Sequence, residues 1–234
     1  MYNYINYKML EIQQIEMSME NIEILRKCSL FKGMKDRQIE SALRKLGATE
    51  KKYRKNSLLI TKGQKEMQLG LMLEGEAVSS QDDVWGNKYI ISEVKCGQTF
   101  AEPYAAADMP SNIIVQAKGT CRVLWLNVSK INFAGNDPVL LLVTSNLLQD
   151  MAFKLLNLNQ RLTHISKQTT QEKLLSYLSA QSEEAKSLDF VIPFNRQELA
   201  DYLSVERSAM SAELSKLVED GKLKTRKNRF TLYP

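Results

Sequence analysis

The 234-residue sequence is poor in the residues that build metal and disulfide sites. It holds three cysteines, Cys28, Cys96 and Cys121, and a single histidine, His164. An odd number of widely separated cysteines favours neither a disulfide framework nor a paired zinc site. One chain's three cysteines also cannot build a four-cysteine iron–sulfur cluster. We therefore expect no metal and no cofactor, and we interpret Cys28 as a buried thiol rather than a redox centre.

Long apolar runs are missing as well. No stretch of about 18 apolar residues is present to span a bilayer. The N-terminus lacks the basic start and apolar middle of a secretory signal. We expect a cytoplasmic location and no membrane partner. Neither a nucleophile elbow, a phosphate-binding loop nor a metal-ligand pair is found, so the sequence does not indicate an enzyme.

What is present is typical of a globular protein with two cores. Hydrophobic residues make up 44% and charged residues 25% of the chain, which excludes a disordered protein. A length of 234 residues accommodates two domains of roughly 100 to 150 residues each. The net charge of +5 suits a polyanionic partner without proving one.

The N-terminal half changes texture along the chain. Residues 20–46 have helical apolar spacing, and we expect Asp36 to cap a short helix. Residues 51–127 then read as short apolar segments separated by glycines, which indicates a compact antiparallel barrel or roll. Gly86-Asn87 is the predicted turn of one hairpin.

A long helix is predicted from Asp137-Pro138, because the acid can cap free amides and proline needs no donor there. Apolar residues then recur at alternating three- and four-residue intervals, a heptad seam that predicts a homodimer. The alternative is a helix lying on its own β-domain. We expect Leu140, Leu147 and Leu156, off the seam, to pack on the roll, and the polar segment 166–170 to be a hinge. The seam comprises Leu141, Thr144, Leu148, Met151, Leu155, Leu158, Leu162 and Ile165.

The C-terminal third predicts a helix-turn-helix. Asn195 can cap a first helix, and small Ala200 lets a second helix approach it closely. The apolar positions are Leu199, Ala200, Leu203, Val205, Met210, Leu214 and Leu217. This packing leaves a polar face at the start of the second helix, where a recognition helix meets base edges in the major groove. That face carries Glu206, Arg207, Ser208, Ser211 and Ala212.

A basic segment follows the second helix. Residues 222–229 contain five basic side chains and no acid, and Phe230 then opens an alternating strand. We predict a β-hairpin wing with Lys224, Arg226 and Lys227 at its tip, facing the phosphates of double-stranded DNA. The alternative is a solvated basic tail.

In the order and spacing of these elements the sequence resembles the cyclic-AMP receptor protein and fumarate-nitrate reduction regulator (CRP/FNR) superfamily of bacterial transcription regulators. The resemblance runs from about Ile24 to Tyr233 and implies an α+β fold. We expect a helical lead-in and sensor β-roll over 1–136, a dimerisation helix and hinge over 137–167, and a winged helix-turn-helix over 168–234.

The resemblance implies roles for several residues. Arg196 and Gln197 match positions that meet the DNA backbone, and Arg207 matches an arginine that reads guanine. Ser208 replaces the family's frequent glutamate, and Ala212 replaces a second arginine, so the operator is expected to differ from the family's usual one. The expected partners are a near-palindromic operator, a second copy of the chain, RNA polymerase and a small-molecule effector.

The effector is not expected to be cyclic AMP. Glu102 matches the glutamate that holds the ribose in cyclic-AMP sensors, but Ser111 stands where an arginine pairs with the cyclic phosphate, and serine supplies no cation. Tyr104 and Asn112 are further candidates to line the effector pocket. Two alternatives remain open: Glu102 as a turn-capping or surface carboxylate, and the chain as a cyclic-nucleotide-binding signalling module with a partner other than DNA. His164 is expected at the surface or the hinge rather than as a haem ligand.

Overall fold

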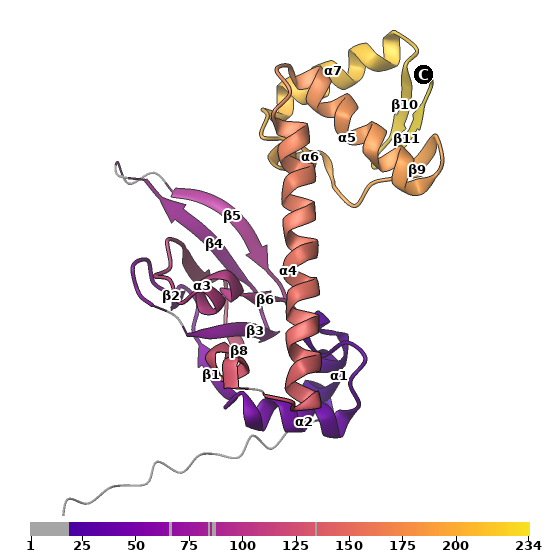
Figure 1. Cartoon of the computed structure of the whole chain (residues 1–234). Coiled ribbons are helices and arrows are strands. Elements are labelled where there is room, and N and C mark those ends of the chain that lie inside the picture. The colour runs from indigo at the N-terminus through magenta and orange to yellow at the C-terminus, as the bar shows by residue number, and fades with distance from the viewer. Residues whose placement is uncertain (1–18, 66, 84, 86–87, 134) are drawn as a thin grey trace, which may run out of the picture. The chain divides into compact units, whose positions relative to one another are not determined.

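The computed structural model describes residues 19–65, 67–83, 85, 88–133 and 135–234 (Figure 1). The chain divides into two compact units, Met1–Met151 and Ala152–Pro234. The first contains α1 (Met19–Lys27), η1 (Ser29–Phe31), α2 (Asp36–Lys45), β1 (Thr49–Tyr53), β2 (Leu58–Ile60), β3 (Gln68–Glu74), β4 (Ala77–Asp82), β5 (Lys88–Val94), β6 (Thr99–Phe100), α3 (Glu102–Ala107), β7 (Ile114–Ala117), β8 (Cys121–Asn127) and η2 (Val128–Phe133). The long helix α4 (Pro138–Ile165) begins in this unit and ends in the second.

The predicted roll is confirmed as two four-stranded antiparallel sheets, in the orders β1-β8-β3-β6 and β2-β7-β4-β5. Side chains from both sheets, among them Met72, Val115 and Trp125, form one apolar cluster. Phe100 meets Trp125 edge to face at 5.4 Å, and its ring occupies the space that a Cβ at Gly70 would need. β4 and β5 pair as the predicted hairpin requires, although Gly86-Asn87 lies outside the described residues.

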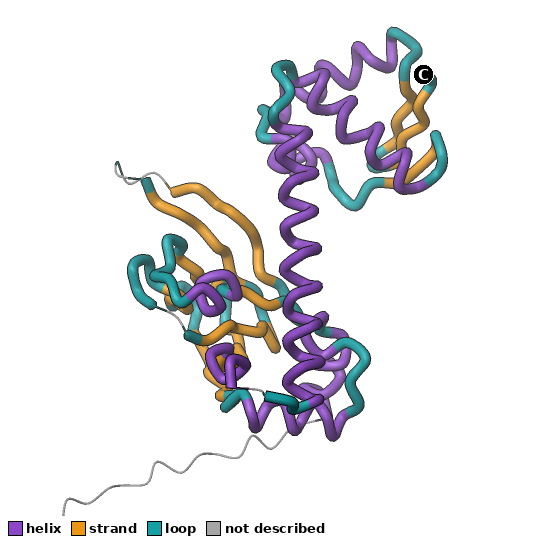
Figure 2. The backbone as a smooth tube through the Cα atoms, in the orientation of Figure 1, coloured by secondary structure: helices purple, strands orange, loops and turns teal. Residues whose placement is uncertain are grey.

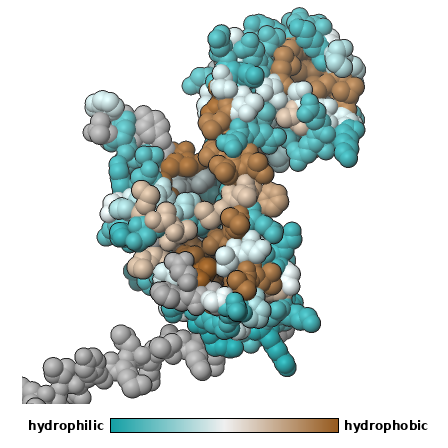
Figure 3. Space-filling view, in the orientation of Figure 1, coloured by the Kyte–Doolittle hydropathy of each residue, from teal (hydrophilic) through white to brown (hydrophobic). Residues whose placement is uncertain are grey.

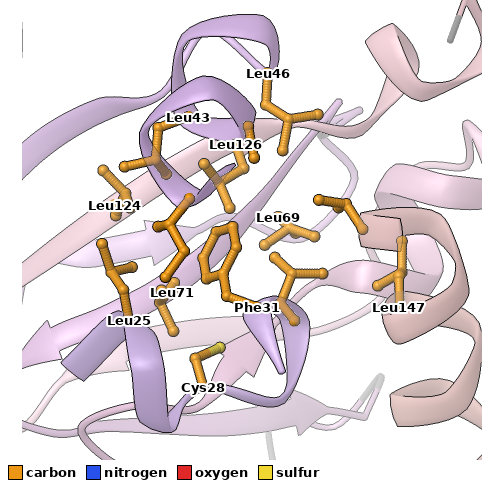
Figure 4. Close-up of a cluster of buried hydrophobic side chains, with 14 of the residues drawn as sticks. Leu25, Cys28, Phe31, Leu43, Leu46, Leu69, Leu71, Leu124, Leu126 and Leu147 are labelled. Carbon is orange, nitrogen blue, oxygen red and sulfur yellow. The ribbon is translucent and has the colours of Figure 1, made fainter. Parts of the chain in front are cut away.

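A second cluster joins the helical lead-in to the outer face of the first sheet (Figure 4). Leu69 and Leu71 of β3 belong to this cluster, whereas Met72 belongs to the roll interior, so β3 is buried on both faces as alternating side chains require. Cys28 is buried here, as predicted. The predicted cap at Asp36 is wrong by one position. Lys35 is the N-cap, and the Asp36 carboxylate instead accepts hydrogen bonds from Arg26.

Helix α4 begins as predicted. The Asp137 carboxylate accepts hydrogen bonds from the amides of Val139 and Leu140 at 3.0 and 3.1 Å. Leu140 and Leu147 are buried in the first unit, and Asn146 donates to the carbonyl of Leu30 at 3.0 Å. The expectation for Leu156 is wrong, because this side chain is 62% exposed.

Length and composition also make α4 apolar enough to cross a membrane, with a mean hydropathy of 1.4 over its most apolar window. This finding corrects the expectation that no such stretch exists. Both Asn146 and Asp150 make hydrogen bonds to the first unit, Asp150 through the hydroxyl of Ser29 at 2.7 Å. The N-terminal half of the helix, up to Met151, is therefore packed on protein.

The second unit contains α5 (Thr170–Ala185), β9 (Asp189–Val191), α6 (Arg196–Leu203), α7 (Arg207–Glu219), β10 (Leu223–Arg226) and β11 (Arg229–Leu232). The strands form a sheet in the order β10-β11-β9 beside the helices (Figure 2). Thr169 and Glu172 make a capping box at the start of α5. Leu174, Leu178, Phe190 and Phe230 belong to a single apolar core with the inner faces of α6 and α7.

Candidate nucleic-acid interface

The helix-turn-helix forms as its spacing predicts. Asn195 accepts hydrogen bonds from the amides of Gln197 and Glu198, and Glu198 accepts from the amide of Asn195, a capping box that fixes where α6 starts. Ser204 ends α6 in the left-handed region at φ +52°. The amide of Val205 then returns to the carbonyl of Ala200 at 3.0 Å. The residues predicted to face inward on both helices are buried, apart from Val205, which is partly buried.

The predicted reading face lies on the first turns of α7. Glu206, Arg207, Ser208, Ser211 and Ala212 are all exposed. Ser211 donates to the carbonyl of Arg207 at 2.9 Å, so its hydroxyl proton is used within the helix while its oxygen can still accept. Arg207 is the reading-face residue with five charged donors, and two of them can pair with one guanine.

The predicted wing is confirmed as the antiparallel hairpin of β10 and β11. Lys227 lies at its tip with φ +56°, next to Arg226. Placing Lys224 at the tip is wrong, because Lys224 pairs with Thr231 within the hairpin. Lys224, Arg226 and Lys227 are exposed, and in the part of the chain that the structure describes none of the three has an ion-pair partner. Arg229, by contrast, pairs with Asp189.

Arg196 points toward the wing. Its Nη2 donates to the hydroxyl of Thr225 at 2.8 Å, and its guanidinium lies 5.0 Å from the centre of the Phe230 ring. Its Nη1 is buried and finds no acceptor among the described residues, and burial lowers the pKa of the guanidinium. Arg196 and Thr225 line a cavity of about 410 Å³ between α7 and the wing. Gln197 is exposed and donates to Asp201 at 2.9 Å.

The predicted effector residues lie around α3. Glu102 is only 4% exposed and follows Ala101, which takes a left-handed φ of +66°. The Ser111 hydroxyl is buried and donates to the carbonyl of Ile113 at 3.0 Å while accepting from the same residue's amide. Ser111 is therefore satisfied within its own loop.

Tyr104 and Asn112 are brought together by a hydrogen bond from the Tyr104 hydroxyl to Asn112 Oδ1. Burial raises the pKa of the Tyr104 hydroxyl, so this group remains a neutral donor at physiological pH. Lys65, whose backbone bridges to Pro110 in this region, pairs with Asp108 at 2.9 Å.

The heptad seam of α4 is largely uncovered. Leu141, Leu148, Leu155, Leu158 and Leu162 are each between 48 and 69% exposed. Figure 3 shows apolar surface along this helix. Met151 and Ile165 are partly buried. A helix lying only on its own β-domain would not leave these leucines in water, so the structure leaves an apolar stripe that a second surface can cover.

Two family models match the chain in the order that its fold gives. The cyclic nucleotide-binding domain matches residues 50–133, and the Crp-like helix-turn-helix domain matches residues 172–233. Together they span more than half of the sequence. The chain belongs to the CRP/FNR family. Members of this family are DNA-binding transcription regulators, and this CRP/FNR chain is one of them.

Solved structures agree on the fold. CprK, in a structure described as complexed with OCPA, has a TM-score of 0.57 and 14% identity over 82% of this chain and 91% of its own. A regulatory protein from Silicibacter pomeroyi DSS-3 has a TM-score of 0.51 and 16% identity over 92% of this chain and 94% of its own. At these identities the likeness shows the fold alone. No curated protein matches the sequence of this CRP/FNR chain.

The sequence of this CRP/FNR chain did not predict two sets of side-chain contacts that join the end of α4 to later helices. Arg161, near the end of α4, donates to the carbonyls of Tyr202 and Asp201. His164 is 3% exposed, which corrects the expectation of a surface position. It bonds the hydroxyl of Ser176 at 2.8 Å. Burial, followed by the charge of Lys167, lowers the pKa of its imidazole. Their partners are distant in sequence, so no local pattern marks them.

Proposed function

We propose that the protein is a homodimeric, sequence-specific transcription regulator that binds a near-palindromic operator in the cytoplasm. The observation that carries this proposal is the exposed face of α7, with Arg207 at its start. Beside it lies a wing in which Lys224, Arg226 and Lys227 have no ion-pair partner among the described residues. A recognition helix supplies base contacts, and the wing supplies phosphate contacts. RNA polymerase is the further protein partner that we propose.

The form of the operator follows from two-fold symmetry. The two helix-turn-helix units of the dimer, called reading heads below, are identical and therefore select two similar half-sites one helical turn apart. Selection of bound duplexes from a random pool by the purified full-length protein tests this directly. We expect the selected sequences to converge on an inverted repeat. Recovery of unrelated sequences, bound no more tightly than random duplex, would contradict the proposal.

The dimer is proposed to form along the seam of α4. Covering apolar surface gains roughly 25 cal/mol per Å², and each seam leucine that is half exposed has surface left to bury. Leu158→Glu should therefore give a monomer in analytical ultracentrifugation. Leu156→Glu is the matched control, since Leu156 is 62% exposed against 52% for Leu158 but lies off the seam, and it should remain dimeric. Dissociation by both substitutions, or by neither, would exclude this seam.

The effector is proposed to be a small molecule other than cyclic AMP. A buried phosphate needs a charged donor, whereas Ser111 is neutral and already bonded to Ile113. Glu102, Tyr104 and Asn112 are proposed to line the effector pocket. Calorimetric titration with cyclic AMP and cyclic GMP should give no binding heat at micromolar concentrations. Saturable binding of either nucleotide would favour the alternative of a cyclic-nucleotide sensor.

A further inference from the structure

The end of α4 is held directly on the first helix of the helix-turn-helix. Arg161 Nε donates to the carbonyl of Tyr202 at 2.9 Å, and its Nη2 donates to the carbonyl of Asp201 at 3.1 Å. The guanidinium also lies 5.4 Å from the centre of the Tyr202 ring. All three contacts reach the last turn of α6, just before the turn of the motif.

The chemistry of that position explains why a cation belongs there. The last carbonyls of a helix lack partners within the helix and carry the negative end of its dipole. A planar guanidinium can satisfy two of them at once and stack on a neighbouring ring, whereas a lysine ammonium presents a single point charge. Arg161 therefore acts as an external cap for α6.

A second contact one turn later fixes the same end of α4. His164 bonds Ser176 of α5 at 2.8 Å, and its ring meets those of Tyr177 and Tyr202 at 5.8 and 6.4 Å. These contacts join the last turn of α4 to α5 and α6 across the polar segment 166–169.

We propose that Arg161 is a positioning residue that fixes the direction of α7 relative to the end of α4. The inference rests on the proposed homodimeric regulator. In that dimer the paired α4 helices would set the separation of the two reading heads through Arg161. Its loss would leave each head intact but free to turn.

Binding to a duplex with two half-sites is compared with binding to a duplex with one. The comparison distinguishes a positioning role of Arg161 from a role in the fold of a single head. Two linked heads bind more tightly than one by a factor of about 10² to 10⁴, and this gain is lost when the geometry is wrong. The probes are a duplex selected by the wild-type protein and the same duplex with one half-site scrambled. We expect Arg161→Met to weaken binding to the full duplex by about tenfold or more, with little change on the scrambled one.

Two further variants of the full-length chain complete the design. Arg161→Lys keeps the charge but not the paired donors, and it should fall between wild type and Arg161→Met. Lys167→Met removes an exposed cation close by in sequence and should bind both duplexes as wild type does. Circular dichroism of each variant should show a folded chain. If Arg161→Met fails to fold, the graded loss on the full duplex is read from Arg161→Lys.

The outcomes distinguish the inference from the function it rests on. Equal losses on both duplexes would overturn the positioning role and indicate that Arg161 only supports the fold of a single head. Unchanged binding to the full duplex would overturn it as well. A wild-type protein that binds neither duplex better than random DNA would instead refute the proposed function, and the inference would fall with it.

Discussion

Arg226 and Arg229 lie opposite each other in the wing, and among the residues that the structure describes only Arg229 has a carboxylate partner. Arg226 and Arg229 pair in the β10–β11 register. Arg229 donates to both oxygens of Asp189, through Nε at 2.9 Å and Nη2 at 2.5 Å. This bond lowers the pKa of the Asp189 carboxyl, so the carboxylate stays charged and neutralises Arg229. We therefore expect Arg226, and not Arg229, to bind phosphate.

The size of the effect follows from counterion release. The logarithm of affinity falls with the logarithm of salt concentration by about 0.9 for each phosphate contacted. The proposed dimer has two wings, so Arg226→Gln removes two contacts and should flatten the slope by about 1.8. Between about 50 and about 200 mM salt, the ratio of wild-type to variant affinity should then shrink roughly twelvefold.

Fluorescence anisotropy with a labelled random duplex, at a series of salt concentrations, measures this slope. The matched control is the double variant Asp189→Asn, Arg229→Gln, which also removes an arginine but leaves the local net charge unchanged. Its slope should match that of wild type. The reasoning is refuted if the double variant flattens the slope as much as Arg226→Gln does, or if Arg226→Gln leaves the slope unaltered.

Three further outcomes are expected. Arg207→Ala should weaken binding to the selected operator by about 1–3 kcal/mol per half-site; an equal loss on random duplex would argue against base reading. The lowered pKa of buried His164 means that the unfolded chain takes up the proton first as the pH falls through about 6.5. The urea midpoint should therefore drop between about pH 7.5 and 5.5, and less so in His164→Gln; parallel drops would show that another group is responsible. Leu217→Ala, at a fully buried position, should destabilise the second unit by about 2–5 kcal/mol in urea titration, and a loss well below this would mean that the core refills the space.

The features that the sequence predicted correctly are those with local causes. Asn195 and Glu198 cap α6 from three residues apart, and the spacing of Leu199 and Leu203 selects the buried face of that helix. Asp137 caps α4 in the same way. Each feature depends on side chains within one or two helical turns, so a single sequence contains the whole signal.

Apart from Leu156, the features that the sequence missed depend on partners far along the chain. The error for Leu156 is a local one: at about 3.6 residues per turn it lies about 180° around the helix from buried Leu147. Arg196 turns toward Thr225 and Phe230, about 30 residues away. Arg161 and His164 find their partners in other helices. Neither the spacing of apolar residues nor the type of a residue shows which distant residue its side chain will contact.

The exposed leucines of α4 should make the stability of this regulator depend on its concentration in the cell. In the proposed dimer, folding and pairing bury one continuous apolar surface, so mass action makes the melting temperature rise with protein concentration. A dilute chain carries those leucines uncovered, which invites proteolysis and aggregation. At a low rate of synthesis, loss of the monomer should therefore lower the amount of protein below what synthesis alone would give. The steady-state amount of protein should rise more steeply than linearly with its rate of synthesis.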